Sequence, residues 1–205
     1  MLKIWGRKTS SNVRKILWCC TELNLEYDRI DWTGPFGGND DPAYRKLNPN
    51  GLVPTIEDGD LVLWESNTIL RYLTHKHSKG NLWPEDAGER GLTEMWMDWQ
   101  LSVINPNTSP IFRGIVHTPE DQRDHAMIKE KSADLCTKWA MFDDHLEGKD
   151  FTLGKKFSMA DIAMGVHANR FIVLVEDRPP LKNLVAWHKR IGERPGFAEH
   201  VPICP

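Results

Sequence analysis

The chain has 205 residues, of which 26 are Lys or Arg and 29 are Asp or Glu, so its formal net charge is −3. This near balance excludes a strongly basic nucleic-acid scaffold and gives no electrostatic attraction to anionic membranes, so we expect neither partner. With 40% hydrophobic and 27% charged residues, the composition is that of a globular protein and excludes disorder as the main state.

The hydrophobic stretches are all short. The sequence has no run of about 18 apolar residues, which is the length that a membrane-spanning helix requires. Residues 1–8 are typical of a short strand and lack the charged-then-apolar layout of a secretory signal. We therefore expect a cytoplasmic protein.

The Cys and His residues show no metal-binding spacing. No C-x-x-C or H-x-x-x-H occurs, so the sequence predicts neither a disulfide framework nor a metal site. The cysteines are interpreted as reduced thiols, and they are Cys19, Cys20, Cys136 and Cys204.

The opening residues predict a strand, a helix and a second strand. Residues 2–6 form the first strand, and apolar residues then recur at i, i+3, i+4 and i+7 from Val13 to Cys20, which predicts a helix beginning near Ser11 or Asn12. Asn24 favours a helix end, and residues 27–32 are a β-prone run. This is a βαβ unit.

The next segment predicts a loop, two strands and a helix. Residues 34–42 are rich in Gly, Pro, Asn and Asp, which favours a surface loop. Strands at 53–57 and 61–64 are joined by a hairpin turn centred on Gly59 and are therefore antiparallel. Ser66 or Asn67 is then the expected N-cap of a helix that ends near His77.

Beyond Pro84, only helical periodicity occurs. Helices are expected at 92–104, 122–146, 159–175 and 181–191, and Ser158 with Asp161 forms the pattern of a capping box. The expected fold class is α/β plus all-α. A thioredoxin-like βαβ-ββα domain at 1–78 precedes a linker at 79–87 and a helical bundle at 88–205.

Four motifs occur in order along the chain: TSSNVRK at 9–15, NPNGLVPTI at 48–56, LWESN at 63–67 and SMAD at 158–161. Together they resemble a cytosolic glutathione S-transferase of the bacterial, theta-like, serine type, over essentially the whole chain. The resemblance implies glutathione as co-substrate, no permanently bound cofactor, and a helical domain that lines a hydrophobic-substrate pocket. Within that domain, no aromatic or cationic residue is assigned to the pocket.

The resemblance also implies the residues that bind glutathione. Val53 would precede a cis-proline, Pro54, and pair its backbone with the cysteinyl segment. Glu65 and Ser66 would bind the γ-glutamyl end, because a helix N-terminus attracts a carboxylate and Glu65 can pair with an ammonium group. The alternative is that Ser66 is only a cap and Glu65 only a favourable first-turn acid.

The group that activates the thiol is expected near the start of the first helix, where no Tyr or Cys is available. Comparison with the theta-like pattern makes Ser10 the first candidate and Ser11 the second. Asn12 is the third, because in some bacterial relatives an asparagine at its position contacts the sulfur. The alternative role for these residues is N-capping.

One position departs from the family pattern. The residue before Val53 is often polar and touches the glycyl end of glutathione, but here it is Leu52. Lys46, Asn48 and Asn50 are candidate substitutes for that contact.

The predicted function is conjugation of glutathione, activated as a thiolate, to a small hydrophobic electrophile. One alternative is a glutathione-dependent disulfide or peroxide reductase, and another is a non-catalytic protein-interaction module, because a fold does not guarantee an activity. A homodimer is expected from the resemblance, with Arg71 as a candidate to reach the partner subunit.

Overall fold

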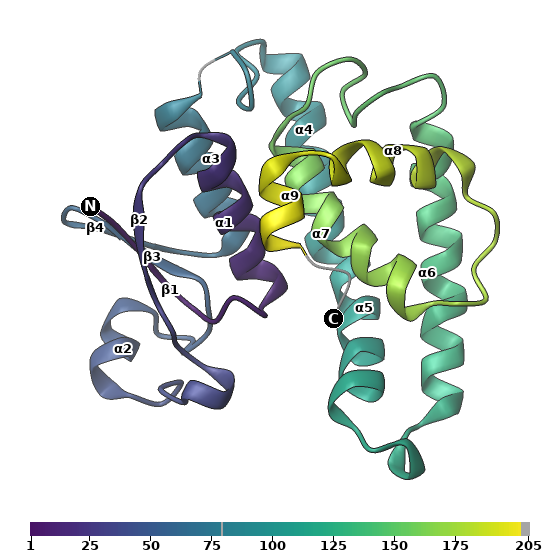
Figure 1. The fold of residues 1–205 in the computed structure, drawn as a ribbon, viewed down its shortest axis with the longest axis horizontal. Coiled ribbons are helices and arrows are strands. Elements are labelled where there is room, and N and C mark those ends of the chain that lie inside the picture. The colour runs from purple at the N-terminus through teal and green to yellow at the C-terminus, as the bar shows by residue number, and fades with distance from the viewer. Residues whose placement is uncertain (79, 202–205) are drawn as a thin grey trace.

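Four short strands near the N-terminus form one mixed sheet in the order β2-β1-β3-β4 (Figure 1). The computed structural model describes residues 1–78 and 80–201. Strand β1 runs parallel to β2 and antiparallel to β3, and β3 and β4 form the expected hairpin, in which Gly59 has φ of 63°. The strands are β1 (Leu2–Trp5), β2 (Tyr27–Ile30), β3 (Thr55–Asp58) and β4 (Leu61–Trp64).

Helices α1 (Ser11–Glu22) and α3 (Ser66–His77) lie between the sheet and the C-terminal helices (Figure 1). Helix α1 begins where the sequence predicts, and Asn24 after it adopts φ of 52°, as expected for a helix end. The N-cap of α3 is Glu65 and not Ser66 or Asn67, so that prediction was wrong by one residue.

A short helix that was not predicted, α2 (Pro42–Leu47), begins at the last residue of the segment 34–42 that was expected as a loop. Asp41 caps it, because its side chain accepts hydrogen bonds from the backbone N–H of Ala43 and of Tyr44. Pro42 suits the first helical position, where no intrahelical N–H bond is lost. The rest of the expected loop is irregular and includes a 3-10 turn at Gly34–Phe36.

The described residues from 80 to 201 form helices and connecting loops, as predicted, but they hold two more helices than expected. Those two are α5, which contains Pro106 and Pro110, and α9 near the end of the described chain. Two π-helical turns, at Gln100–Ile104 and Arg113–His117, flank α5. The helices are α4 (Ala87–Trp99), α5 (Asn105–Phe112), α6 (His125–His145), α7 (Met159–Leu174), α8 (Lys182–Gly192) and α9 (Pro195–His200).

Helix α7 is the centre of the helical part, and its residues from Met159 to Phe171 are all buried. It starts with the predicted capping box, in which the N–H of Ser158 donates to Asp161 Oδ2 over 2.8 Å. Helix α9 packs on α1 so closely that a Cβ on Gly196 would lie 2.3 Å from Trp18 Cδ1. The core is therefore continuous between the sheet domain and the helical domain.

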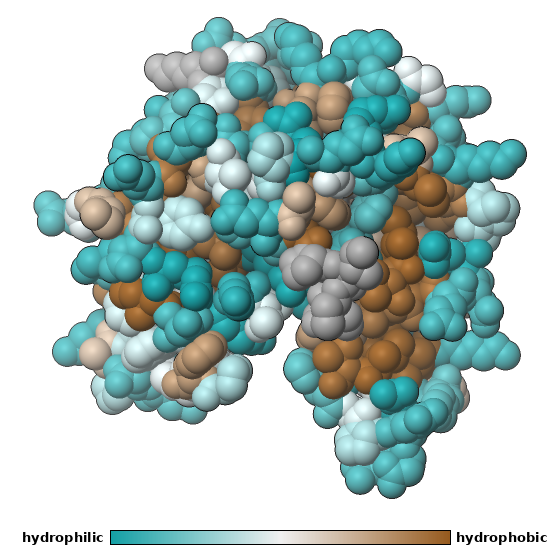
Figure 2. All heavy atoms as spheres, in the orientation of Figure 1, coloured by the Kyte–Doolittle hydropathy of each residue, from teal (hydrophilic) through white to brown (hydrophobic). Residues whose placement is uncertain are grey.

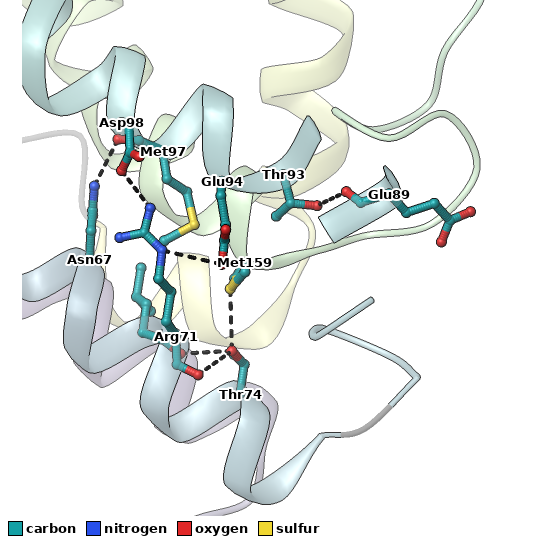
Figure 3. A network of polar contacts seen from close by, with 10 residues as sticks. Asn67, Arg71, Thr74, Glu89, Thr93, Glu94, Met97, Asp98 and Met159 are labelled. Carbon is teal, nitrogen blue, oxygen red and sulfur yellow. Dashed lines mark hydrogen bonds and ion pairs between the residues drawn. The ribbon is translucent and has the colours of Figure 1, made fainter. Parts of the chain in front are cut away.

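Polar contacts join α3 to α4 across the boundary between the two domains (Figure 3). Asn67 Nδ2 donates to the carbonyl of Met97 over 2.8 Å. Arg71 pairs with Asp98 at 2.5 Å and with Glu94 at 3.7 Å. Arg71 therefore has acidic partners in its own chain, and its contact with a partner subunit stays a prediction.

The predicted fold class is confirmed: a βαβ-ββα domain with a mixed sheet is followed by an all-helical part. Cys19 and Cys20 are fully buried in α1, whereas Cys204 and Lys79 lie outside the described residues. None of the helices in the described part of the chain combines the length and the apolar composition needed to cross a membrane.

Candidate active site

Three segments that are far apart in the sequence meet at one end of the sheet. They are the junction of β1 with α1, the turn before β3, and the start of α3. Gly6, with φ of 148°, makes the close approach possible, because a Cβ there would lie 2.4 Å from Val13 Cγ2 and 3.1 Å from Val53 Cβ. These distances bring the turn with Val53 against the start of α1.

Ser10 is the N-cap residue of α1, but its side chain makes no capping hydrogen bond. Its backbone carbonyl accepts from the N–H of Arg14 over 2.9 Å, while its half-buried hydroxyl is not used to cap the helix. Ser11 is the first helical residue and is only 8% exposed. Of the two serines, Ser10 is therefore the one that is more open to a ligand.

Asn12 and Ser66 connect the two helix starts. Ser66 Oγ donates to Asn12 Oδ1 over 3.2 Å, although the two residues are 54 positions apart. Ser66 is 5% exposed, whereas the neighbouring Glu65 is exposed and has φ of 72°. A non-glycine residue in the left-handed region costs about 1–3 kcal/mol, and such residues concentrate at ligand sites.

The Val53-Pro54 peptide bond is cis. Within the described residues, no protein group forms a hydrogen bond with the backbone N–H or C=O of the half-buried Val53. Leu52 is different, because its side chain is 61% exposed while its carbonyl accepts from Tyr44 Oη at 2.6 Å and from Asn48 Nδ2 at 2.8 Å. The turn is therefore fixed at Leu52 and leaves the main chain of Val53 available.

Asn48 does not fit its proposed role as a glycyl contact. It is 2% exposed, and besides the Leu52 carbonyl its Nδ2 also reaches Thr55 Oγ1 at 3.2 Å. Asn48 is therefore a structural residue of the turn. Lys46 and Asn50 are both exposed and stay candidates for that contact.

Sequence reasoning missed the buried Lys15, which lies behind the Asn12–Ser66 contact. Its Nζ donates to Ser66 Oγ at 3.3 Å, to Asn67 Oδ1 at 3.1 Å and to Gln100 Oε1 at 2.8 Å. Burial lowers the pKa of Lys15 to about 7, although the nearby Glu65 carboxylate raises it. No local pattern could have identified this cage of three acceptors around Lys15, because they lie 51 to 85 residues from Lys15 in the sequence.

A cluster of arginines was also missed. Arg170 of α7 lies 3.7 Å above the ring of Phe112, and it is 7% exposed. Burial, and then the like charges of Arg14 and Arg7, lower the pKa of Arg170 to about 10. Arg7 and Arg14, which flank Ser10 in the sequence, are therefore close enough to Arg170 to act on its charge.

Figure 2 shows a notch between the lobe that contains α2 and the lower part of the helical domain, with hydrophobic side chains gathered on the helical side. Phe112 belongs to α5, which borders this notch (Figure 1). Trp96 and Trp99 instead pack edge to face in the aromatic core, with ring centroids 5.2 Å apart. Within residues 1–78 and 80–201, no three His, Cys, Asp or Glu side chains group in a way that could hold a metal ion.

Comparisons with known proteins identify the family. The family model described as "Glutathione S-transferase, N-terminal domain" matches residues 9–76, and the corresponding C-terminal domain model matches residues 137–190. The chain is 35% identical to the glutathione S-transferase GstB of Escherichia coli K12, over 99% of each chain.

The chain is also similar to glutathione S-transferases from other organisms. Glutathione S-transferase 3 of Zea mays is 29% identical over 100% of this chain and 95% of its own. A crystal structure of the theta class glutathione S-transferase from Xanthomonas axonopodis pv. citri with glutathione bound is 44% identical, with a TM-score of 0.94 over 98% of this chain and 96% of that one. The chain therefore belongs to the glutathione S-transferase family.

Proposed function

We propose that this transferase activates glutathione at Ser10 and conjugates it to a small hydrophobic electrophile. Ser10 Oγ would donate a hydrogen bond to the thiolate, with Asn12 and then Ser11 as the alternative donors. The N–H and C=O of Val53, held next to Leu52 and Pro54, would pair with the cysteinyl segment as an added strand does.

Glu65 and Ser66 would bind the γ-glutamyl end of glutathione. The start of α3 offers free backbone N–H groups and a positive helix dipole to the γ-glutamyl carboxylate. The exposed carboxylate of Glu65, held at positive φ, is suited to pair with the γ-glutamyl ammonium group. The observation that carries the proposal is the Ser66–Asn12 hydrogen bond, because it joins the expected glutamyl residue to the expected thiol segment.

The energy that thiol activation requires is modest. A free thiol has a pKa of about 8.5, and lowering it by one to two units takes about 1.4 to 2.7 kcal/mol. A hydrogen bond to a charged group contributes about 1.5 to 3 kcal/mol, and a helix N-terminus adds about 0.3 to 1 kcal/mol. These two contributions cover the requirement, so a general base is not required.

Product analysis tests this proposal. The purified protein is incubated with glutathione and 1-chloro-2,4-dinitrobenzene, and the thioether adduct is measured together with oxidised glutathione formed from an added peroxide or disulfide. The adduct is expected. Oxidised glutathione alone would identify a reductase, and no turnover of either kind would leave a non-catalytic interaction module.

We also propose a cytoplasmic C₂ homodimer. Residues 1–78 would form the glutathione-binding domain, 79–87 the linker and 88–205 the domain that lines the electrophile pocket. The exposed Leu92 and Met95 of α4 support an interface on that helix, because they are one helical turn apart and 52% and 50% exposed.

A further inference from the structure

Lys15 is fully buried, and each of its three N–H groups has an acceptor. The acceptors come from the start of α3, through Ser66 and Asn67, and from the π-helical turn through Gln100. An ammonium group has three donors and no acceptor, so this cage matches the protonated side chain. The cage therefore defines how the groups around Lys15 must orient their own hydrogens.

The orientation of Ser66 follows from that of Lys15. Because the ammonium form of Lys15 can only donate, Ser66 Oγ accepts from it and directs its own hydrogen to Asn12 Oδ1 at 3.2 Å. Asn12 is then held with its oxygen toward Ser66 and its amide nitrogen away from it. No acceptor for that nitrogen is found within the described part of the chain, so its two N–H donors are available to a ligand.

We propose that Lys15 is a positioning residue that orients both the glutamyl-binding hydroxyl of Ser66 and the amide of Asn12 through one hydrogen-bond relay. This inference rests on the proposed function, because Ser66 and Asn12 are the residues assigned there to the two ends of the γ-glutamylcysteinyl segment. Lys15 itself has no exposed surface, so it would act on the ligand only through Ser66 and Asn12.

The protonation of Lys15, and with it the relay, depends on the charged groups around this residue. The carboxylate of Glu65 at the start of α3 favours the ammonium form, whereas Arg170 of α7 disfavours it. His167 of α7 is also fully buried near Lys15, and burial keeps its pKa well below the usual range, so it is neutral. A ligand carboxylate at Ser66 would add negative charge beside Lys15 and would strengthen the relay.

Lys15→Met removes all three donors and keeps a side chain of similar length. We expect the KM for glutathione to rise roughly tenfold, because the Ser66 hydroxyl loses its fixed orientation. We expect kcat to fall several-fold, because the Asn12 amide also loses its fixed orientation. Thr74→Val is the matched control. Thr74 is a fully buried polar residue of the same helix α3 that bonds only within α3 and to Met159, so its kinetics should stay at the wild-type level.

A double-mutant cycle separates the relay from a merely structural role. In a Ser66→Ala background the relay is already broken, so Lys15→Met should raise the glutathione KM no further. The proposal would be overturned if Lys15→Met raised the glutathione KM by the same factor in the wild-type and Ser66→Ala backgrounds. Wild-type kinetics in a folded Lys15→Met protein would also overturn it. If Lys15→Met does not fold, Lys15→Gln enters the same cycle with the same expected result. A wild-type protein without glutathione turnover overturns the proposed function and this inference together, whereas an active wild type with an additive cycle overturns only the role of Lys15.

Discussion

Trp187 Nε1 donates a hydrogen bond to Asp161 Oδ1 over 2.8 Å, which joins α8 to the first turn of α7. The same oxygen accepts from the N–H and Oγ1 of Thr152, at 2.8 and 2.7 Å, and the other carboxylate oxygen accepts from Ser158. Asp161 is fully buried, so one side chain satisfies donors from three separate segments.

The first prediction is that Asp161→Ala lowers the free energy of unfolding by about 3 kcal/mol, because it leaves several buried donors without an acceptor. Urea denaturation measures this loss. Asp60→Ala, at an exposed turn position, is the control and should change the stability by less than about 0.5 kcal/mol. A loss below about 1 kcal/mol for Asp161→Ala would show that the network adds little to stability.

The second prediction is that Ser10→Ala lowers turnover by roughly ten- to a hundredfold, since a hydrogen bond to a thiolate is worth about 1.5 to 3 kcal/mol. Its melting temperature should stay unchanged because the Ser10 side chain does not cap α1. Ser11→Ala and Asn12→Ala are measured in parallel. Full activity of Ser10→Ala together with an inactive Asn12→Ala would transfer the role to Asn12.

The third prediction concerns Glu65, whose φ of 72° is the conformation that glycine adopts most easily. Glu65→Gly should raise the glutathione KM by roughly tenfold, because the γ-glutamyl ammonium loses its partner, and should leave kcat nearly unchanged. Its melting temperature should not fall. Glu65→Gln keeps the unfavourable φ and removes only the charge. It should therefore show the same rise in KM as Glu65→Gly, without any gain in stability over the wild type. An unchanged KM in both variants would contradict the glutamyl role.

The fourth prediction is that binding of S-methylglutathione, which has no ionisable thiol, takes up a proton at pH 7.5 to 8. The pKa of Lys15 is about 7 because burial disfavours its charge, so the ammonium form predominates below pH 7 and is lost as the pH rises through that value. A bound carboxylate near Ser66 would raise this pKa and return the proton. Lys15 also affects the stability of the fold. Between pH 7 and about 10.4 the unfolded chain binds more protons at this residue than the folded chain does, so the folded state gains stability as the pH rises.

Proton uptake on binding is measured by titration calorimetry in phosphate and in Tris, because the two buffers release different heats when they give up a proton. S-methylglutathione is the ligand, because it has no thiol that could release a proton on binding. The wild-type protein should give different heats in the two buffers, and Lys15→Met should give equal heats after correction for affinity. Equal heats for the wild type would contradict the assignment.

Local patterns predicted the elements whose signals are short-range. Helix α1 begins at Ser11 as its apolar spacing indicates, and the β3-β4 hairpin follows from the turn at Gly59. Helix α5 was not predicted because Pro106 and Pro110 argue against a helix in sequence terms. Pro106 lies in the first turn, where the missing N–H costs little, and π-helical turns lie on both sides of α5, so the helix accommodates both prolines.

The candidate site could be predicted only in part, for a related reason. Ser10, Val53 and Ser66 lie in recognisable motifs, but Lys15 lies outside the apolar stripe of α1 and is typical of a solvent-exposed position. It is buried because α3, α7 and α9 cover α1 on several sides, which is a tertiary arrangement without a local signal. Arg170 was missed for the same reason, since its partner Phe112 is 58 residues away (170 − 112).

The last prediction concerns assembly. We expect a particle of about twice the 23.6 kDa of one chain in light scattering at micromolar concentration, because two-fold contacts bury the same patch on both subunits. A stable interface of this kind buries at least about 1,000 Å², and charged residues at its centre would be costly to desolvate. Leu92→Glu with Met95→Glu should therefore shift the protein toward the monomer. Met141→Glu is the matched control, since Met141 is equally exposed, at 57%, but lies on α6. A wild-type mass near 23.6 kDa in an active preparation would contradict the dimer, and dissociation by Met141→Glu alone would move the interface to α6.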